Sequence, residues 1–194
     1  MINKIIAIQG NHPSKLNPKT DTSVFLANEI QKKNYEIFYY DPKNLSVKGS
    51  KVIAEGFFIN FNYNNKKFYK ILRKQKLDLV KCKYILIRQD PPFNMEYIST
   101  TYILETIKNK VKIINDPTSI RNISEKLYSV KYLDFMPKTI FTQNIQEIKN
   151  FFKKNKYVIL KPIHSFSGND IHLLNKFKLN LIKKFIKKHD YIMC

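Results

Sequence analysis

One residue type and position that could hold a ligand is a lysine at the end of an apolar segment. Lys161 follows the apolar residues 157–160 and precedes Pro162, after which comes a loop of small and polar residues, 164–170. An ammonium group and the backbone N–H groups of such a loop both counter negative charge, so they suit nucleotide phosphates. Lys126, at the start of a helical stretch, is a second candidate. In a chain with 35 Lys and Arg residues, a solvated surface lysine is the competing interpretation.

Another polar group follows the apolar segment 84–87. Residues 88–93 read RQDPPF, and the two prolines exclude a helix and require an extended or sharply turned backbone. Ligands of open α/β sheets bind at the carboxyl ends of strands, so Arg88 and Asp90 lie where a site is expected. Asp90 has a structural alternative, in which its carboxylate accepts hydrogen bonds from backbone N–H groups of the turn.

Other catalytic signatures are absent from the sequence. The chain has no GxSxG, Walker or GxGxxG motif, and its histidines lack the spacing of zinc ligands: His12, His164, His172 and His189. Cys82 and Cys194 are too few and too far apart for a disulfide framework, which suits a reducing compartment. With no signal-peptide pattern and no apolar run of ~18 residues, we expect a cytoplasmic protein without a membrane segment.

The charge of the chain suggests a polyanion as a partner. Its 35 basic and 15 acidic residues give a net charge of +20, and clustered Lys and Arg bind nucleic acid or anionic membranes. However, only three of the basic residues are Arg, and the lysines are scattered along the chain. We therefore favour a solvated basic surface and expect no nucleic-acid partner.

The order of predicted elements favours an α/β fold. A strand at 5–8, a helix from residue 22 capped by Asp21, and a strand at 35–40 form the strand–helix–strand unit of a parallel sheet. Gly49 and Gly56 interrupt an alternating segment, which predicts short antiparallel strands within an insertion at 47–63. Further strands are predicted at 84–87, 111–114, 139–142, 157–160, 171–174 and 191–193, and helical segments at 95–109, 117–128, 145–152 and 179–186.

Three segments resemble the bacterial glutathione synthetase family. These are RQDPPFNMEYISTTYILE (88–105), NDPTSIRNISEKLYS (115–129) and VILKPIHSFSGND (158–170), and their order and spacing agree with the family. Asp21-Thr22-Ser23 matches as well, so the resemblance spans the whole chain. It implies a Rossmann-like parallel-sheet domain that precedes the ATP-grasp fold (1–122), followed by the first, lid-forming part of a truncated ATP-grasp domain (123–194).

The resemblance also implies a reaction. The family phosphorylates the cysteinyl carboxylate of γ-glutamylcysteine with ATP, and the amine of glycine then displaces phosphate to give glutathione. Phosphorylation supplies the leaving group that a carboxylate lacks, while two divalent cations, Mg²⁺ or Mn²⁺, offset the charge on the phosphates. The expected partners are therefore small molecules, and the full-length chain is expected to be a homo-oligomer.

Carried over residue by residue, the resemblance assigns roles to several candidates. Lys126 and Lys161 match the two nucleotide-phosphate lysines, with Ser167 and Gly168 in the phosphate loop. Arg88 matches the arginine that holds a substrate carboxylate, for which a planar two-pronged donor is suited. Asp90 is either a substrate ligand or a structural residue, whereas Asp21 is expected to be a helix cap. No catalytic residue is assigned.

The sequence departs from the family pattern in two places. The loop 164–170 retains only Gly168, where the family has a glycine-rich loop, although Ser can donate hydrogen bonds and Asn tolerates left-handed backbone. The chain also stops at Cys194, where the family continues to its adenine hinge and metal ligands, so we expect these 194 residues alone to lack ligase activity. The alternatives are another ATP-grasp carboxylate–amine ligase, or a basic nucleic-acid- or anion-binding module without catalysis.

Overall fold

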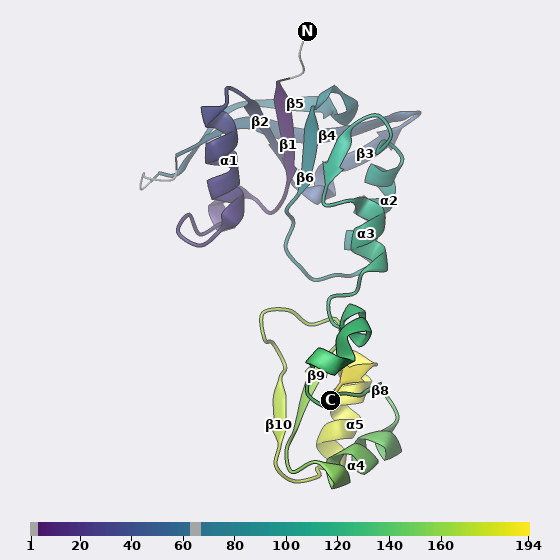
Figure 1. Ribbon diagram of the computed structural model, residues 1–194. Helices are drawn as coiled ribbons and strands as arrows, with labels where there is room; N and C mark the ends of the chain where they lie inside the picture. The colour runs from purple at the N-terminus through teal and green to yellow at the C-terminus, as the bar shows by residue number, and fades with distance from the viewer. Residues whose placement is uncertain (1–3, 63–66) are drawn as a thin grey trace. The chain divides into compact units, whose positions relative to one another are not determined.

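The computed structural model describes residues 4–62 and 67–194, and the chain divides into two compact units, residues 1–122 and 123–194 (Figure 1). The first unit is built on a central sheet. Its parallel strands are β1 (Ile5–Gln9), β2 (Glu36–Tyr40), β6 (Tyr84–Ile87) and β7 (Lys112–Ile114), in the order β2-β1-β6-β7. Strands β1, β2 and β6 read as apolar runs because both of their faces are largely covered, whereas β7 at the edge buries only Ile113.

Antiparallel strands extend this sheet beyond β2. They are β3 (Leu45–Lys48), β4 (Lys51–Phe61) and β5 (Tyr69–Asp78), and β4 pairs with β2, β3 and β5. The predicted parallel sheet is thus the centre of a mixed sheet, and the antiparallel pattern expected at 47–63 is confirmed as far as Phe61. Tyr63, the last residue of that range, lies outside the described residues.

Helices cover both faces of the central sheet. On one face, Val24 and Ala27 of α1 (Thr22–Lys32) pack with Ile6, Ile8 and neighbouring apolar residues. On the other face, Leu104 of α2 (Met95–Glu105) packs with alternate strand residues such as Ala7. Short 3-10 turns complete the connections: η1 (Pro13–Lys15), η2 (Pro42–Asn44) and η3 (Leu79–Lys81).

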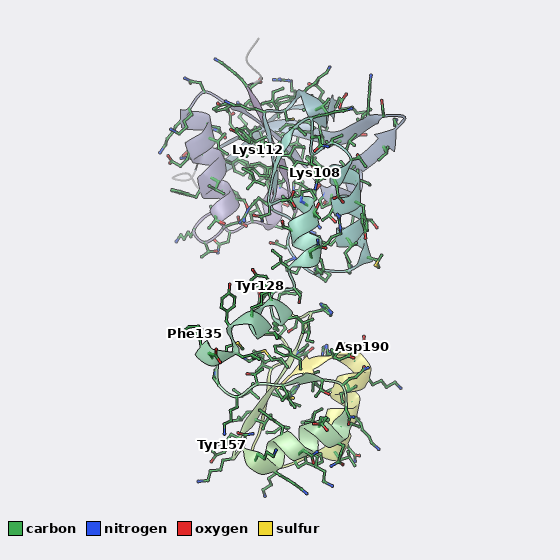
Figure 2. All side chains as sticks on the ribbon, turned by 45° about the vertical axis from the view of Figure 1, so that its right-hand side comes forward. Lys108, Lys112, Tyr128, Phe135, Tyr157 and Asp190 are labelled. Atoms are coloured by element: carbon green, nitrogen blue, oxygen red, sulfur yellow. The ribbon has the colours of Figure 1, made fainter. Side chains whose placement is uncertain are left out.

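An ion-pair network joins α2 to α3 (Pro117–Asn122). The Glu105 carboxylate accepts hydrogen bonds from the Thr118 hydroxyl at 2.5 Å and from the Arg121 guanidinium, and it pairs with Lys108 at 3.3 Å. Lys108 is labelled in Figure 2. The Thr118 hydrogen bond and then the Arg121 guanidinium lower the pKa of Glu105 to about 2. The carboxylate thus stays charged and keeps the last helix of this unit against α2.

The second unit has its own sheet and core. Within its described residues the strand order is β10-β9-β11-β8, with β8 (Phe141–Thr142), β9 (Val158–Pro162), β10 (His172–Leu174) and β11 (Ile192–Met193). Helices α4 (Ile145–Lys154) and α5 (Leu179–His189) bury Ile148, Ile182 and Phe185 against one face of this sheet. The facing pair Ile159 and Leu173, 44% and 63% exposed, marks the other face as open.

Two segments differ from the sequence prediction. The helix predicted from 117 to 128 is wrong, because α3 ends at Asn122 and a separate 3-10 segment, η4 (Leu127–Phe135), follows. None of the η4 side chains is buried, and Phe135, labelled in Figure 2, is 89% exposed. No core therefore selects a regular α-helix here. The strand β5 was not predicted, because residues 70–76 are all exposed and show no apolar alternation.

Candidate substrate and nucleotide sites

The first candidate site lies where β1, β2 and β6 end. Arg88 directly follows β6, and its backbone N–H donates to the carbonyl of Gln9 at 2.7 Å. Its side chain turns to the beginning of α1, where Nε donates to Ser23 Oγ at 3.1 Å and Nη2 donates to Thr22 Oγ1 at 2.5 Å. A guanidinium beside the first turn of a helix combines two sources of positive potential, which suits a carboxylate.

Asp21 is confirmed as the cap of this helix. Its carboxylate accepts a hydrogen bond from Ser23 N at 2.7 Å, which satisfies one of the free N–H groups of the first turn. By fixing the start of α1, the cap also fixes the two hydroxyl groups that hold the Arg88 guanidinium.

Asp90 lies in the turn after β6 and contacts another loop. Its Oδ2 accepts a hydrogen bond from Asn11 Nδ2 at 2.6 Å, while the turn itself contains a cis bond between Pro91 and Pro92. The structural alternative placed backbone N–H groups at this carboxylate, whereas the described contact is with the Asn11 side chain. Asp90 thus joins the loops that follow β6 and β1, and it brings Asn11 into the site.

A buried glutamine, which sequence reasoning missed, connects the same strand ends. Gln9 is fully buried, and its Nε2 donates to Gln89 Oε1 at 2.5 Å while its Oε1 accepts from the Tyr40 hydroxyl at 3.0 Å. The Thr100 hydroxyl also donates to Gln89 Oε1, at 3.3 Å. Gln9 carries one weak sequence signal, since it is the polar end of an otherwise apolar strand.

Tyr39 is the second residue that sequence reasoning missed. Its hydroxyl donates to the carbonyl of Asn11 at 2.8 Å, and burial, followed by the negative charges of Asp21 and Asp90, raises its pKa. The phenol therefore stays neutral and donates. Gly10 allows this approach, because a Cβ at Gly10 would lie 2.5 Å from the Tyr39 hydroxyl oxygen and 3.4 Å from the Arg88 carbonyl oxygen.

The second candidate site lies in residues 123–194, around Lys126. The Lys126 side chain is 15% exposed, and its ammonium donates to the carbonyls of Ser165 at 2.6 Å and Ile163 at 3.4 Å. Both carbonyls belong to the segment that follows Lys161. The structure therefore brings Lys126 to the predicted phosphate loop, although the two are almost 40 residues apart in sequence.

Lys161 lies on β9, two residues after Ile159, and is paired with Met193 of β11. It lines a cavity of about 500 Å³ together with Ile159, Tyr157 and mainly apolar neighbours; Tyr157 is labelled in Figure 2. The remaining wall comes from Met136, Pro137, Lys138, Thr139, Phe151, Asn155, Val158, Met193 and Cys194. An apolar cavity lined by two lysines, Lys138 and Lys161, suits a flat ring that carries phosphates.

The loop after Lys161 turns sharply at Ser167 and Gly168. Their φ angles are +53° and +72°, and Asn169 N donates to the carbonyl of Phe166 at 3.0 Å, as in a type I′ turn. Both residues are exposed, which leaves the turn accessible to a ligand. Three residues of this loop have a left-handed backbone, namely Ser167, Gly168 and Asp170, and Asn169 is not among them.

The end of the loop is attached to α5. Asp170 Oδ2 pairs with Lys188 Nζ at 2.6 Å and lies 3.2 Å from His189 Nε2. The hydrogen bond from Lys188 lowers the pKa of Asp170, whereas burial lowers the pKa of His189. Asp170 itself has a left-handed backbone, and its ion pair with Lys188 joins the end of the loop to α5.

In residues 4–62 and 67–194, no three His, Cys, Asp or Glu side chains are grouped so that they could hold a metal ion. In the same ranges, every helix is too short or too polar to cross a membrane.

Comparison with solved structures identifies the fold as that of ATP-grasp ligases. D-alanyl-alanine synthetase A from Vibrio cholerae matches with a TM-score of 0.60 and 12% identity, over 100% of this chain and 60% of its own. A RiPP-associated ATP-grasp ligase from Chryseobacterium gregarium matches with a TM-score of 0.57 and 15% identity, over 98% of this chain and 61% of its own. That structure is a complex with ADP and with a leader and core peptide. The predicted fold class is confirmed.

The sequence comparisons specify the family. Residues 5–121 match the N-terminal domain of prokaryotic glutathione synthetase, and residues 125–193 match its ATP-grasp domain. The chain therefore belongs to the prokaryotic glutathione synthetase family, as its motifs predicted. The glutathione synthetase of Mesorhizobium japonicum is 36% identical over 91% of this chain, and that of Buchnera aphidicola subsp. Baizongia pistaciae is 33% identical over 93%. The chain spans 56% and 57% of those two proteins, respectively.

Proposed function

We propose that this chain is part of an ATP-dependent ligase that joins γ-glutamylcysteine to glycine and releases glutathione, ADP and phosphate. In this reaction the cysteinyl carboxylate attacks the γ-phosphorus of ATP, and the amine of glycine then displaces phosphate from the acyl phosphate. Membership of the glutathione synthetase family over nearly the whole chain carries this proposal. We assign residues 1–122 to the domain that precedes the ATP-grasp fold and residues 123–194 to an incomplete ATP-grasp domain.

Arg88 is proposed to bind a carboxylate of the dipeptide. Its guanidinium is already oriented by two hydroxyl groups at the first turn of α1, so little side-chain freedom is lost on binding. Asp90 is proposed to act on the substrate through Asn11, whose amide group it holds. The same contact supports a structural role for Asp90 in keeping two loops together.

Lys126 and Lys161 are proposed to bind the phosphates of ATP. Lys126 contacts the carbonyls at the start of the loop, and Lys161 lines the apolar cavity. The exposed turn at Ser167 and Gly168 would offer backbone N–H groups to the same phosphates. The cavity beside Lys161 would exclude water from the adenine ring. The ammonium groups of Lys126 and Lys161 would then fix the direction of the phosphate chain.

The family reaction also uses Mg²⁺ or Mn²⁺, which offsets charge on the transferred phosphoryl group. The described residues do not form a metal site, so the roles proposed for this chain concern substrate and nucleotide alone. Because the chain spans 56% and 57% of the two relatives compared, we propose that the 194 residues by themselves do not form glutathione. We further propose that the complete enzyme is a cytoplasmic homo-oligomer that binds no nucleic acid.

Calorimetric titration with ATP and with γ-glutamylcysteine tests these roles separately. Lys161→Met should weaken ATP binding at least about tenfold, because it removes a charge-assisted contact, and the exposed Lys156→Met is its matched control. Arg88→Lys should weaken only the dipeptide, with the exposed Arg73→Lys as control. Equal effects of site and control variants would refute these roles. A salt-sensitive complex with DNA would instead favour a polyanion-binding module.

A further inference from the structure

A second cavity lies in the first unit, beside the substrate site, and Tyr39 is the one residue of that site that also lines it. It measures about 250 Å³ and is lined by His12, Tyr39, Asp41, Lys43, Asn44, Gly56 and Phe57. Asp41 directly follows β2, and His12 belongs to the loop after β1. The cavity thus lies at the carboxyl ends of two parallel strands, where α/β sheets bind ligands.

Two of the residues that line this cavity, Asp41 and Lys43, have opposite charges. Asp41 is held in place because its Oδ1 accepts a hydrogen bond from Lys43 N at 3.0 Å, as the cap of η2. The same turn brings Lys43 to the cavity wall. One acidic and one basic residue lining the same cavity match the two charges of an α-amino acid group.

Aromatic rings form the apolar part of the cavity. The rings of Tyr39 and Phe57 are stacked, with centroids 6.0 Å apart and an angle of 13° between their planes. The imidazole of His12 approaches Phe57 edge-on at 5.8 Å. Such a wall accommodates methylene groups that follow an amino acid head. At ~30 Å³ for each water-sized group, the cavity has room for about eight, against about seven non-hydrogen atoms in a glutamyl head with its two methylenes.

The cavity and Arg88 adjoin the same short segment of chain. The Tyr39 hydroxyl, at the cavity, donates to the carbonyl of Asn11, and Gly10 separates this hydroxyl from the Arg88 carbonyl. Strands β2 and β6 flank β1, so their ends lie about 10 Å apart at the usual spacing of ~4.8 Å between strands. A γ-linked dipeptide extends roughly 7–9 Å from its glutamyl Cα to its cysteinyl carboxylate, from standard bond lengths.

We infer that the cavity beside His12 binds the α-amino acid end of a γ-glutamyl substrate. Asp41 accepts hydrogen bonds from the α-ammonium group, and Lys43 pairs with the α-carboxylate. The cysteinyl end then extends across β1 toward Arg88. This inference rests on the proposed function and adds to it the residues that distinguish a γ-glutamyl group from other acyl groups.

Ligand analogues that each lack one charge test the inference on the 194-residue chain. Glutarylcysteine lacks the α-ammonium group, and 4-aminobutanoylcysteine lacks the α-carboxylate. Wild type should bind each at least about tenfold more weakly than γ-glutamylcysteine. Asp41→Asn should abolish the preference over glutarylcysteine alone, and Lys43→Gln the preference over 4-aminobutanoylcysteine alone. Asn at position 41 still caps η2, so the fold is retained.

Asp78→Asn is the matched control, because Asp78 caps η3 in the same way at a distance from the cavity. The His12 ring resonances supply a direct measurement, since they should shift on dipeptide binding while those of His164 do not. If the dipeptide binds and Arg88→Lys weakens it while Asp41→Asn and Lys43→Gln leave both preferences intact, the inference is wrong and the proposed function stands. If wild type binds no dipeptide, both are wrong for this chain.

Discussion

The hydrogen bond between Tyr40 and Gln9 should make a measurable contribution to the stability of the first unit. Both side chains are fully buried, and the Tyr40 hydroxyl donates to Gln9 Oε1 at 3.0 Å. Tyr40→Phe removes only the hydroxyl and leaves a buried oxygen without this donor, which costs about 1–3 kcal/mol. Gln9→Met removes the partner of both Tyr40 and Gln89, so it should cost at least as much.

The double variant distinguishes a specific hydrogen bond from general damage to the core. When both partners are apolar, neither leaves an unsatisfied group toward the other, so the two effects should fall short of additivity by about 1–2 kcal/mol. Urea unfolding, followed by the amide resonances of β1 and β6, reports the first unit alone. The exposed Tyr102→Phe is the control and should stay within about 0.5 kcal/mol of wild type. Strict additivity in the cycle would refute the reasoning.

Two further variants test the ion-pair network and the phosphate loop. Glu105 has a pKa of about 2, below its ordinary value of 4.5, so its stabilisation is complete above pH 4.5 and is lost as the pH falls toward 2. Glu105→Gln should therefore lower the urea midpoint of the first unit at pH 7, and the difference should vanish in acid; a difference that persists at pH 2 would contradict this. Gly168→Ala should destabilise the second unit by about 1–2 kcal/mol, because φ is +72° while the nearest atom to a Cβ is 3.9 Å away. Gly49→Ala, at φ +59° in open space, should cost the first unit a similar amount, and two neutral variants would show that these turns relax.

The sequence was most informative for strands that are short, continuous apolar runs. Segments 5–8, 84–87 and 157–160 read as apolar runs and lie at β1, β6 and β9. By contrast, β5 is exposed and rich in lysine, so its pattern gave no sign of the pairing with β4 that makes it a strand. The helix predicted to Tyr128 extends into η4, where no side chain is buried to stabilise a regular helix.

The site was predictable to the extent that strand ends and family motifs indicate it. Arg88 and Lys161 follow apolar strands, which is a local pattern. Gln89 and Asp90, which contact Gln9 and Asn11, are 80 and 79 residues away in sequence, so only the fold reveals these roles. The same limit applies to Asp41, which in the sequence is one polar residue before a proline and in the structure lines a charged cavity.

The basic side chains of the exposed strand β5 affect how the sheet of one molecule can associate with that of another. Among the described residues β5 pairs with β4 alone, which leaves its other edge free to recruit a strand from a second molecule. Cationic side chains occur along its exposed stretch, namely Lys70, Arg73, Lys74 and Lys76. Two such edges repel each other on approach, so these charges protect the sheet against edge-to-edge aggregation.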